Sequence, residues 1–203
     1  MINLSPQYWN MVTDSDIRNL SLPDKLYSYA DSYLSAATTF CIQLSTDTKL
    51  CTWSNGAVVM MLTAHSIELF LKAAILSKDA GSDILNQGNH SIDSLFMEFN
   101  TKYPEPKYRW DNPFRTAYPD NMDEGDLKKI KNSAPHPSIL YRYPVDRTGK
   151  DWQGAYGFEP HSYKLLLEQL KSDFIRIQSS SSLSKAGNLS VNTVVEAQVS
   201  RTS

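Results

Sequence analysis

The spacing of apolar residues predicts a mostly helical chain. Between residues 24 and 44, apolar side chains recur every three or four positions, which is typical of one face of an amphipathic helix. Pro23 and Asp24 are both favourable in a first helical turn. We therefore expect a first helix that ends at about Leu44. Its apolar stripe is Leu26, Tyr29, Ala30, Tyr33, Leu34, Ala37, Phe40 and Cys41.

The segment 55–78 is apolar on nearly all sides of the helix that it predicts. A helix of this kind is expected to be buried at the centre of a domain. Ser54 or Asn55 can cap its start. Three polar residues interrupt its middle, so we interpret it as a core helix and not as a membrane span. These residues are His65, Glu68 and Lys72.

Two further helices complete the predicted fold. His90-Ser91-Ile92-Asp93 opens a third helix that ends before Pro104, and a fourth runs from Glu159-Pro160 to about Gln178. Short connections between helices favour antiparallel neighbours. The expected fold class is therefore mostly α, a four-helix up-down bundle. We expect one helical domain over residues 1–178, followed by a serine-rich, mobile tail over 179–203.

Residues 103–158 form an insert that does not follow the helical pattern. The insert is rich in tyrosine, tryptophan and phenylalanine, whereas disordered segments are poor in aromatic residues. Residues 123–132 could form a short helix. Residues 139–143 and 155–158 alternate as strands do, on either side of Arg147-Thr148-Gly149-Lys150. We expect a β-hairpin there, laid against the bundle.

Composition and charge narrow the functional classes. The chain has 203 residues and a net charge of −2, so no overall field attracts nucleic acid or an anionic membrane. The N-terminus does not have the pattern of a signal peptide. Cys41 and Cys51 match no zinc motif and are too few for a disulfide framework. We therefore expect a cytoplasmic protein with free thiols, no membrane partner and no cofactor.

The polar residues of the central helix are the candidate catalytic group. His65, Glu68 and Lys72 have spacings of three and four, which place them on one face. They could form an acid–base pair, or a small-molecule pocket in which Lys72 binds an anion. The alternative, which the spacing favours, is a structural ion pair between Glu68 and Lys72 with His65 hydrogen-bonded to a neighbouring helix.

Other site chemistries find little support in the sequence. The remaining histidines, His90, His136 and His161, do not stand four residues from His65 as a zinc-protease helix requires, and we expect no metal site. No serine lies in a glycine-framed nucleophile elbow. Glycines do not cluster before a helix to hold phosphate.

Basic residues mixed with aromatics make the insert the candidate binding surface. Such a mixture can hold phosphates while bases stack on the rings. The alternative is a solvated loop whose aromatics pack inward. The candidate binding residues are Arg142, Tyr143, Arg147, Lys150 and Trp152. A second basic cluster, Lys128, Lys129 and Lys131, precedes His136.

Three segments resemble the HEPN superfamily of small helical bundles. They are AHSIELFLKAAILSKDAG, GNHSIDSLF and LYRYPVD, and the first carries Glu68-Leu69 and Lys72-Ala73 at the positions of a Glu-Leu-x-x-Lys-Ala core. His90 matches a position that we interpret as structural. The resemblance covers roughly residues 24–178. It implies a four-helix bundle, often dimeric, of the kind found in ribonuclease toxins, toxin–antitoxin and defence systems, and partners of nucleotidyltransferases.

The chain departs from the ribonuclease members of that superfamily. Those members carry an arginine followed, after four to six residues, by a histidine, and none of the four histidines here has an arginine at that distance. The leading hypothesis is therefore a non-catalytic, homodimeric binding or scaffold protein that recognises RNA, a nucleotide or a protein partner through the insert. The alternative is a divergent ribonuclease that uses His65 or His136 with Lys72 or Lys131.

Overall fold

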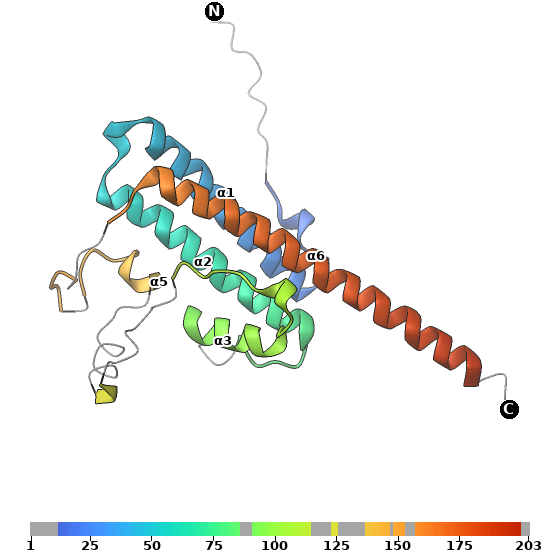
Figure 1. Ribbon diagram of the computed structural model, residues 1–203. Coiled ribbons are helices and arrows are strands. Elements are labelled where there is room, and N and C mark those ends of the chain that lie inside the picture. The colour runs from blue at the N-terminus through green and yellow to red at the C-terminus, as the bar shows by residue number, and fades with distance from the viewer. Residues whose placement is uncertain are drawn as a thin grey trace, which may run out of the picture.

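The chain is mostly helical, as the apolar spacing predicts (Figure 1). The computed structural model describes residues 12–85, 91–114, 123–125, 137–146, 148–152 and 157–199. Within these residues, three short 3-10 turns accompany the helices: η1 (Asp14–Asp16), η2 (Thr48–Leu50) and η3 (Pro106–Tyr108). The helices are α1 (Leu22–Thr46), α2 (Trp53–Lys78), α3 (Ile92–Lys102), α5 (Pro137–Leu140) and α6 (Pro160–Val199).

Side-chain caps set the starts of the first helices. The backbone N–H of Asp24 donates to Ser21 Oγ at 3.3 Å, which satisfies one of the free N–H groups of the first turn of α1. Thr52 Oγ1 accepts in the same way from the N–H of Asn55, at 3.4 Å. The predicted cap of α2, Ser54 or Asn55, is therefore wrong, because both residues already lie within its first turn.

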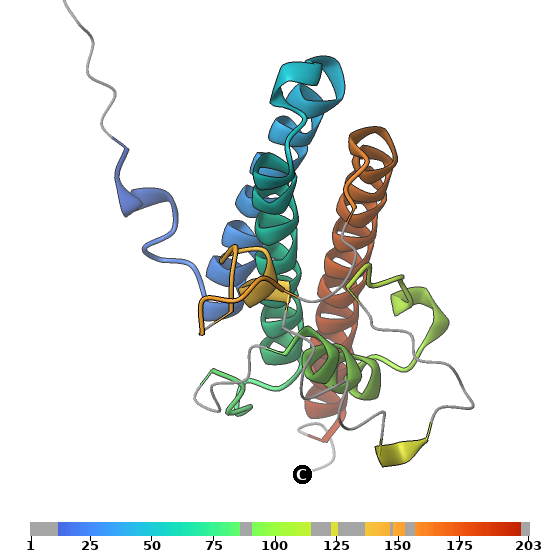
Figure 2. The ribbon, with the colours of Figure 1, turned by 90° about the vertical axis from the view of Figure 1, so that its left-hand side faces the viewer.

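Helix α2 lies at the centre of the domain and contacts α1, α3, α5 and α6 (Figures 1 and 2). Its most apolar window is long enough to cross a membrane, but 72% of that window is buried within the protein. The prediction of a buried central helix is confirmed. Close packing also accounts for Gly56, since a Cβ there would lie 2.9 Å from the ring of Phe158.

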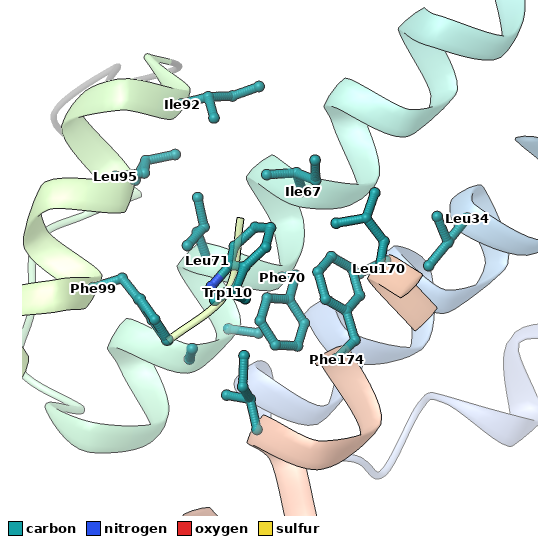
Figure 3. Close-up of a cluster of buried hydrophobic side chains, with 14 of the residues drawn as sticks. Leu34, Ile67, Phe70, Leu71, Ile92, Leu95, Phe99, Trp110, Leu170 and Phe174 are labelled. Atoms are coloured by element: carbon teal, nitrogen blue, oxygen red, sulfur yellow. The ribbon is translucent and has the colours of Figure 1, made fainter. Parts of the chain in front are cut away.

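An aromatic cluster joins α2 to α6 and to the start of the insert (Figure 3). The ring of Phe70 in α2 stacks on Phe174 in α6, with centroids 3.7 Å apart. Trp110 meets both rings edge-on, at 6.3 Å and 5.7 Å. Edge-to-face contacts of this kind stabilise a core beyond the area that they bury. The first part of the insert is therefore part of the hydrophobic core.

The β-hairpin predicted in the insert is not found among the described residues. Ile139 and Leu140 belong to α5, and the extended pairing is limited to one antiparallel bridge between Val145 and Asp151. Pro137 explains the error, because proline favours the first turn of a helix and so short an apolar run does not distinguish helix from strand. Part of the second expected strand lies outside the described residues.

Helix α6 continues beyond the predicted end at Gln178 and reaches Val199. Its C-terminal part projects past the other helices (Figure 1). No glycine or proline follows Gln178 closely enough to stop the backbone there. A short helix was expected over residues 123–132, of which the structure describes 123–125. Residues 124 and 125 are helical, and the rest of the expected helix lies outside the described residues.

Candidate functional site

The polar face of α2 holds a buried ion pair. Lys72 Nζ donates to Glu68 Oε1 at 2.8 Å, and the two side chains are only 8% and 6% exposed. His65 is more open, and its Nδ1 lies 3.9 Å from Glu68 Oε2. The imidazole packs edge-on against Tyr33 of α1, with ring centroids 4.6 Å apart. The structure thus brings the three predicted residues together on one face.

The burial of this pair and the other contacts of α2 favour a structural role. Hydroxyl groups on the same helix are already engaged: Ser66 Oγ donates to the carbonyl of Ala30 at 2.7 Å, and Thr63 Oγ1 donates to the carbonyl of Val59 at 2.8 Å. A charge removed from water costs free energy unless an opposite charge compensates it. Lys72 and Glu68 compensate each other in this way.

A metal site is not seen in the part of the chain that the structure describes. No three residues among its histidines, cysteines, aspartates and glutamates gather closely enough to bind an ion. The thiol of Cys41 is buried and donates to the carbonyl of Pro160 at 3.3 Å. Burial raises the pKa of this thiol to about 11, which disfavours the thiolate that a nucleophile needs.

The loop from Arg142 to Trp152 is held by its own hydrogen bonds. Asp146 Oδ1 accepts from the backbone N–H of Thr148 at 2.7 Å, from its hydroxyl at 2.7 Å and from the N–H of Lys150 at 3.0 Å. These bonds, the hydroxyl first, hold the pKa of Asp146 below its usual value. The indole Nε1 of Trp152 donates to the carbonyl of Tyr143 at 2.7 Å, which closes the loop.

All five predicted binding residues belong to this loop, and the structure describes four of them. Arg142 and Lys150 are exposed, Tyr143 is 53% exposed and Trp152 is half-buried. Gly149 has a φ of +80°, the left-handed conformation that the turn needs and glycine readily adopts. Other candidates lie outside the described residues: Arg147, His90, His136 and the lysines at 128, 129 and 131.

A pocket that the sequence analysis did not identify lies between α3 and residues 103–111. Its volume is about 580 Å³. Aromatic rings and polar groups line it together, and they include Phe96, Asn100, Tyr103, Arg109, Trp110 and Asp111. The aromatic residues of the insert were a partial indication of this pocket in the sequence. Nothing in their spacing indicates that α3 supplies the opposite wall.

Arg176 of α6 holds the segment that forms one wall of this pocket. Its guanidinium donates to the carbonyls of Lys107 and Arg109, the latter at 2.8 Å. Asp173, which is 8% exposed, binds the same guanidinium at 2.6 Å. The two bonds to the carbonyls fix the backbone of the segment against α6, and Asp173 holds the guanidinium in place. This contact was not predicted from the sequence, because Arg176 lies 69 and 67 residues along the chain from Lys107 and Arg109.

The chain matches no protein-family model, no curated protein and no solved structure. Its function is therefore inferred from the residues above and from the resemblance of its central segments.

Proposed function

We propose that the protein is a non-catalytic, HEPN-like binding protein that recognises single-stranded RNA through the loop from Arg142 to Trp152. The helices α1, α2, α3 and α6 are compatible with the four-helix up-down bundle that the resemblance implies, and they carry the Glu68–Lys72 pair on the central one.

The observation that carries the proposal is the exposed Tyr143 on a hydrogen-bonded loop. Its ring is available to a base, and Arg142 and Lys150 on the same loop are exposed cations that can approach phosphates. The hydrogen bonds to Asp146 and from Trp152 order this loop before any ligand binds. A preordered loop loses less conformational entropy on binding, which favours affinity.

The state of the polar residues in α2 supports a non-catalytic role. A general acid or base must reach the substrate. Lys72 is buried and already paired with Glu68. The ring of Tyr33 packs edge-on against the imidazole of His65 and covers part of it. A divergent ribonuclease would therefore have to break the ion pair before Lys72 could act on RNA.

RNA binding can be measured by fluorescence anisotropy with a labelled single-stranded RNA of about 12 nucleotides, a length suited to a loop-sized site. We expect Tyr143→Ala to weaken binding about tenfold, which is the typical effect of one lost base–aromatic stack. Tyr29→Ala is the matched control, since Tyr29 is 49% exposed and belongs to α1 and not to the loop. This control should leave the affinity unchanged.

Four results would overturn the proposal. RNA binding could be absent at about 50 mM salt, where phosphate contacts are strong. The two tyrosine variants could behave alike. The RNA could also be cleaved, with cleavage lost in His65→Ala or His136→Ala, and that result would establish the ribonuclease alternative. Binding of a protein to the loop in place of RNA would show that the loop recognises a protein partner.

We also propose that the protein acts as a homodimer in the cytoplasm, in a stress or defence system. The resemblance supports this, and Leu165 and Ile175 of α6 provide exposed apolar side chains for self-association. Sedimentation equilibrium tests it: the wild type should have twice the chain mass, and Leu165→Lys should shift it towards the monomer. A wild-type monomer at high micromolar concentration would refute it.

A further inference from the structure

Helices α1 and α2 share a partly exposed, largely apolar face on the side of the pair away from α6. Its residues repeat at spacings of four and seven on both helices, so each set stays on one side of its helix. Leu22 is 49% exposed and Val58 is 40% exposed, while the other four residues are partly buried. We call this surface the α1–α2 face. It consists of Leu22, Leu26 and Tyr33 on α1 and Val58, His65 and Leu69 on α2.

Contacts on both sides of α1 fix the direction of this face. The ring of Tyr33 packs edge-on against His65 at 4.6 Å, which joins the two sets of residues. Helix α6 contacts α1 on another side, since Lys171 Nζ lies 3.5 Å from Asp31 Oδ1 and 3.4 Å from Ser35 Oγ. Asp31 and Ser35 each stand two positions from Tyr33, which is about 200° around the helix. The α1–α2 face therefore points away from α6.

The C-terminal part of α6 has an apolar stripe of its own. Residues 181–199 project past the other helices (Figure 1), although α6 is one continuous helix from Pro160 to Val199. Spacings of four, four and three place a set of apolar or small residues on one side of this segment, whereas its two charged residues stand on the opposite side. The first set is Leu183, Gly187, Val191 and Val194, and the charged residues are Lys185 and Glu196.

The projecting part of α6 needs a partner to be stable as a helix. Serine, glycine, asparagine and valine make up most of it, and these residues rank below alanine, leucine and lysine in helix propensity. Helices in proteins are stabilised mostly by packing of an apolar side against another surface. Because α6 is continuous, residues 181–199 do not fold back onto the α1–α2 face of their own chain. The surface that stabilises them therefore belongs to another molecule.

We propose that residues 181–199 dock on the α1–α2 face of a second copy of this chain, and that the exchange is reciprocal. The proposal rests on the homodimer proposed above and names the surfaces that form it. The stripe from Leu183 to Val194 and both sets of the α1–α2 face each run eleven positions along a helix, a length of about 16 Å. A second copy is favoured over an unrelated partner, because each chain carries both surfaces and a two-fold dimer makes each contact twice.

Sedimentation velocity of full-length variants tests the exchange. Val191→Asp places a charge in the proposed interface, and we expect it to raise the dissociation constant of the dimer at least about tenfold. Leu189→Asp is the matched control, because position 189 stands about 200° around the helix from 191. It should change the dissociation constant by no more than about twofold. Val58→Lys, on the α1–α2 face, should act like Val191→Asp. Thermal denaturation followed by circular dichroism shows that each variant domain remains folded.

Mixing the two interface variants gives the most specific result. The Val191→Asp chain keeps an intact α1–α2 face, and the Val58→Lys chain keeps an intact projecting helix. A mixed dimer therefore retains one of the two reciprocal contacts, whereas a dimer of either variant with itself retains neither. We expect the mixed dimer to bind at least about threefold more tightly than either variant binds itself.

The outcomes separate this exchange from the proposed homodimer. Equal effects of Val191→Asp and Leu189→Asp, or a mixture that associates no better than either variant alone, would refute the exchange. A dimer that is weakened by Leu165→Lys but not by Val191→Asp would also refute it, while leaving the homodimer in place. A wild-type monomer at high micromolar concentration would refute both.

Discussion

The buried pair of Glu68 and Lys72 gives the sharpest prediction about what stabilises this fold. Replacing Lys72 with methionine keeps most of the side-chain volume but leaves the Glu68 carboxylate in the core without its ammonium partner, which now lies at 2.8 Å. Removing one member of a buried ion pair typically costs about 3 to 5 kcal/mol. Because both side chains are less than a tenth exposed, solvent offers little compensation.

We therefore expect Lys72→Met to lower the free energy of unfolding by about 3 kcal/mol. For a domain of this size that loss corresponds to a fall in Tm of roughly 6 to 12 °C. Urea denaturation followed by circular dichroism measures it. Lys164→Met is the matched control. It breaks an ion pair of the same i, i+4 spacing with Glu168, at 3.7 Å, in which both side chains are more than a third exposed. Its expected effect is within about 0.5 kcal/mol.

The double variant Glu68→Gln, Lys72→Met measures the interaction energy between the two charges separately from their interactions with the rest of the core. If the two charges compensate each other, the double variant should be less destabilised than the sum of the two single variants, by about 1 to 3 kcal/mol. A loss below about 1 kcal/mol in Lys72→Met would refute the structural role, because a buried carboxylate cannot lose an ammonium partner at 2.8 Å at so small a cost. Unchanged stability with lost RNA binding would instead assign Lys72 to a ligand site.

Three further predictions follow from single contacts. Arg176→Ala should lower the free energy of unfolding by roughly 1 to 2 kcal/mol, since it removes charged hydrogen bonds to two carbonyls; an unchanged urea denaturation curve would contradict this role of Arg176. Glu159 caps α6, and hydrogen bonds led by the Ser162 hydroxyl lower its pKa to about 2 from 4.5. Its contribution to stability is therefore complete above pH 4.5 and is lost as the pH falls towards about 2. The difference in urea midpoint between wild type and Glu159→Gln should shrink over that interval, and a difference that stays constant would contradict it. A thiol reagent at neutral pH should modify the exposed Cys51 in the native protein but Cys41 only after unfolding; equal rates, followed by absorbance, would show that Cys41 is accessible.

The sequence by itself determined the main helices and the ion pair between Glu68 and Lys72 within α2. Apolar spacing located α1, α2 and α3 to within a few residues, because a helix repeats every 3.6 residues and its hydrogen bonds join residues four apart. The same rule placed Glu68 and Lys72 on one face. The alternating pattern at 139–143 led to the wrong prediction of a strand for a related reason. Five residues are too few to distinguish a strand from one helical turn.

Only the tertiary structure decided the environments of these residues. The apolar pattern predicted a buried helix, but the burial of both charged side chains of the Glu68–Lys72 pair depends on α1 and the other helices that surround α2. The pocket beside Trp110 likewise needs α3, the insert and Arg176 of α6 together. Contacts between segments nearly 70 residues apart leave no local periodicity in the chain, because each side chain is selected for packing against a distant partner.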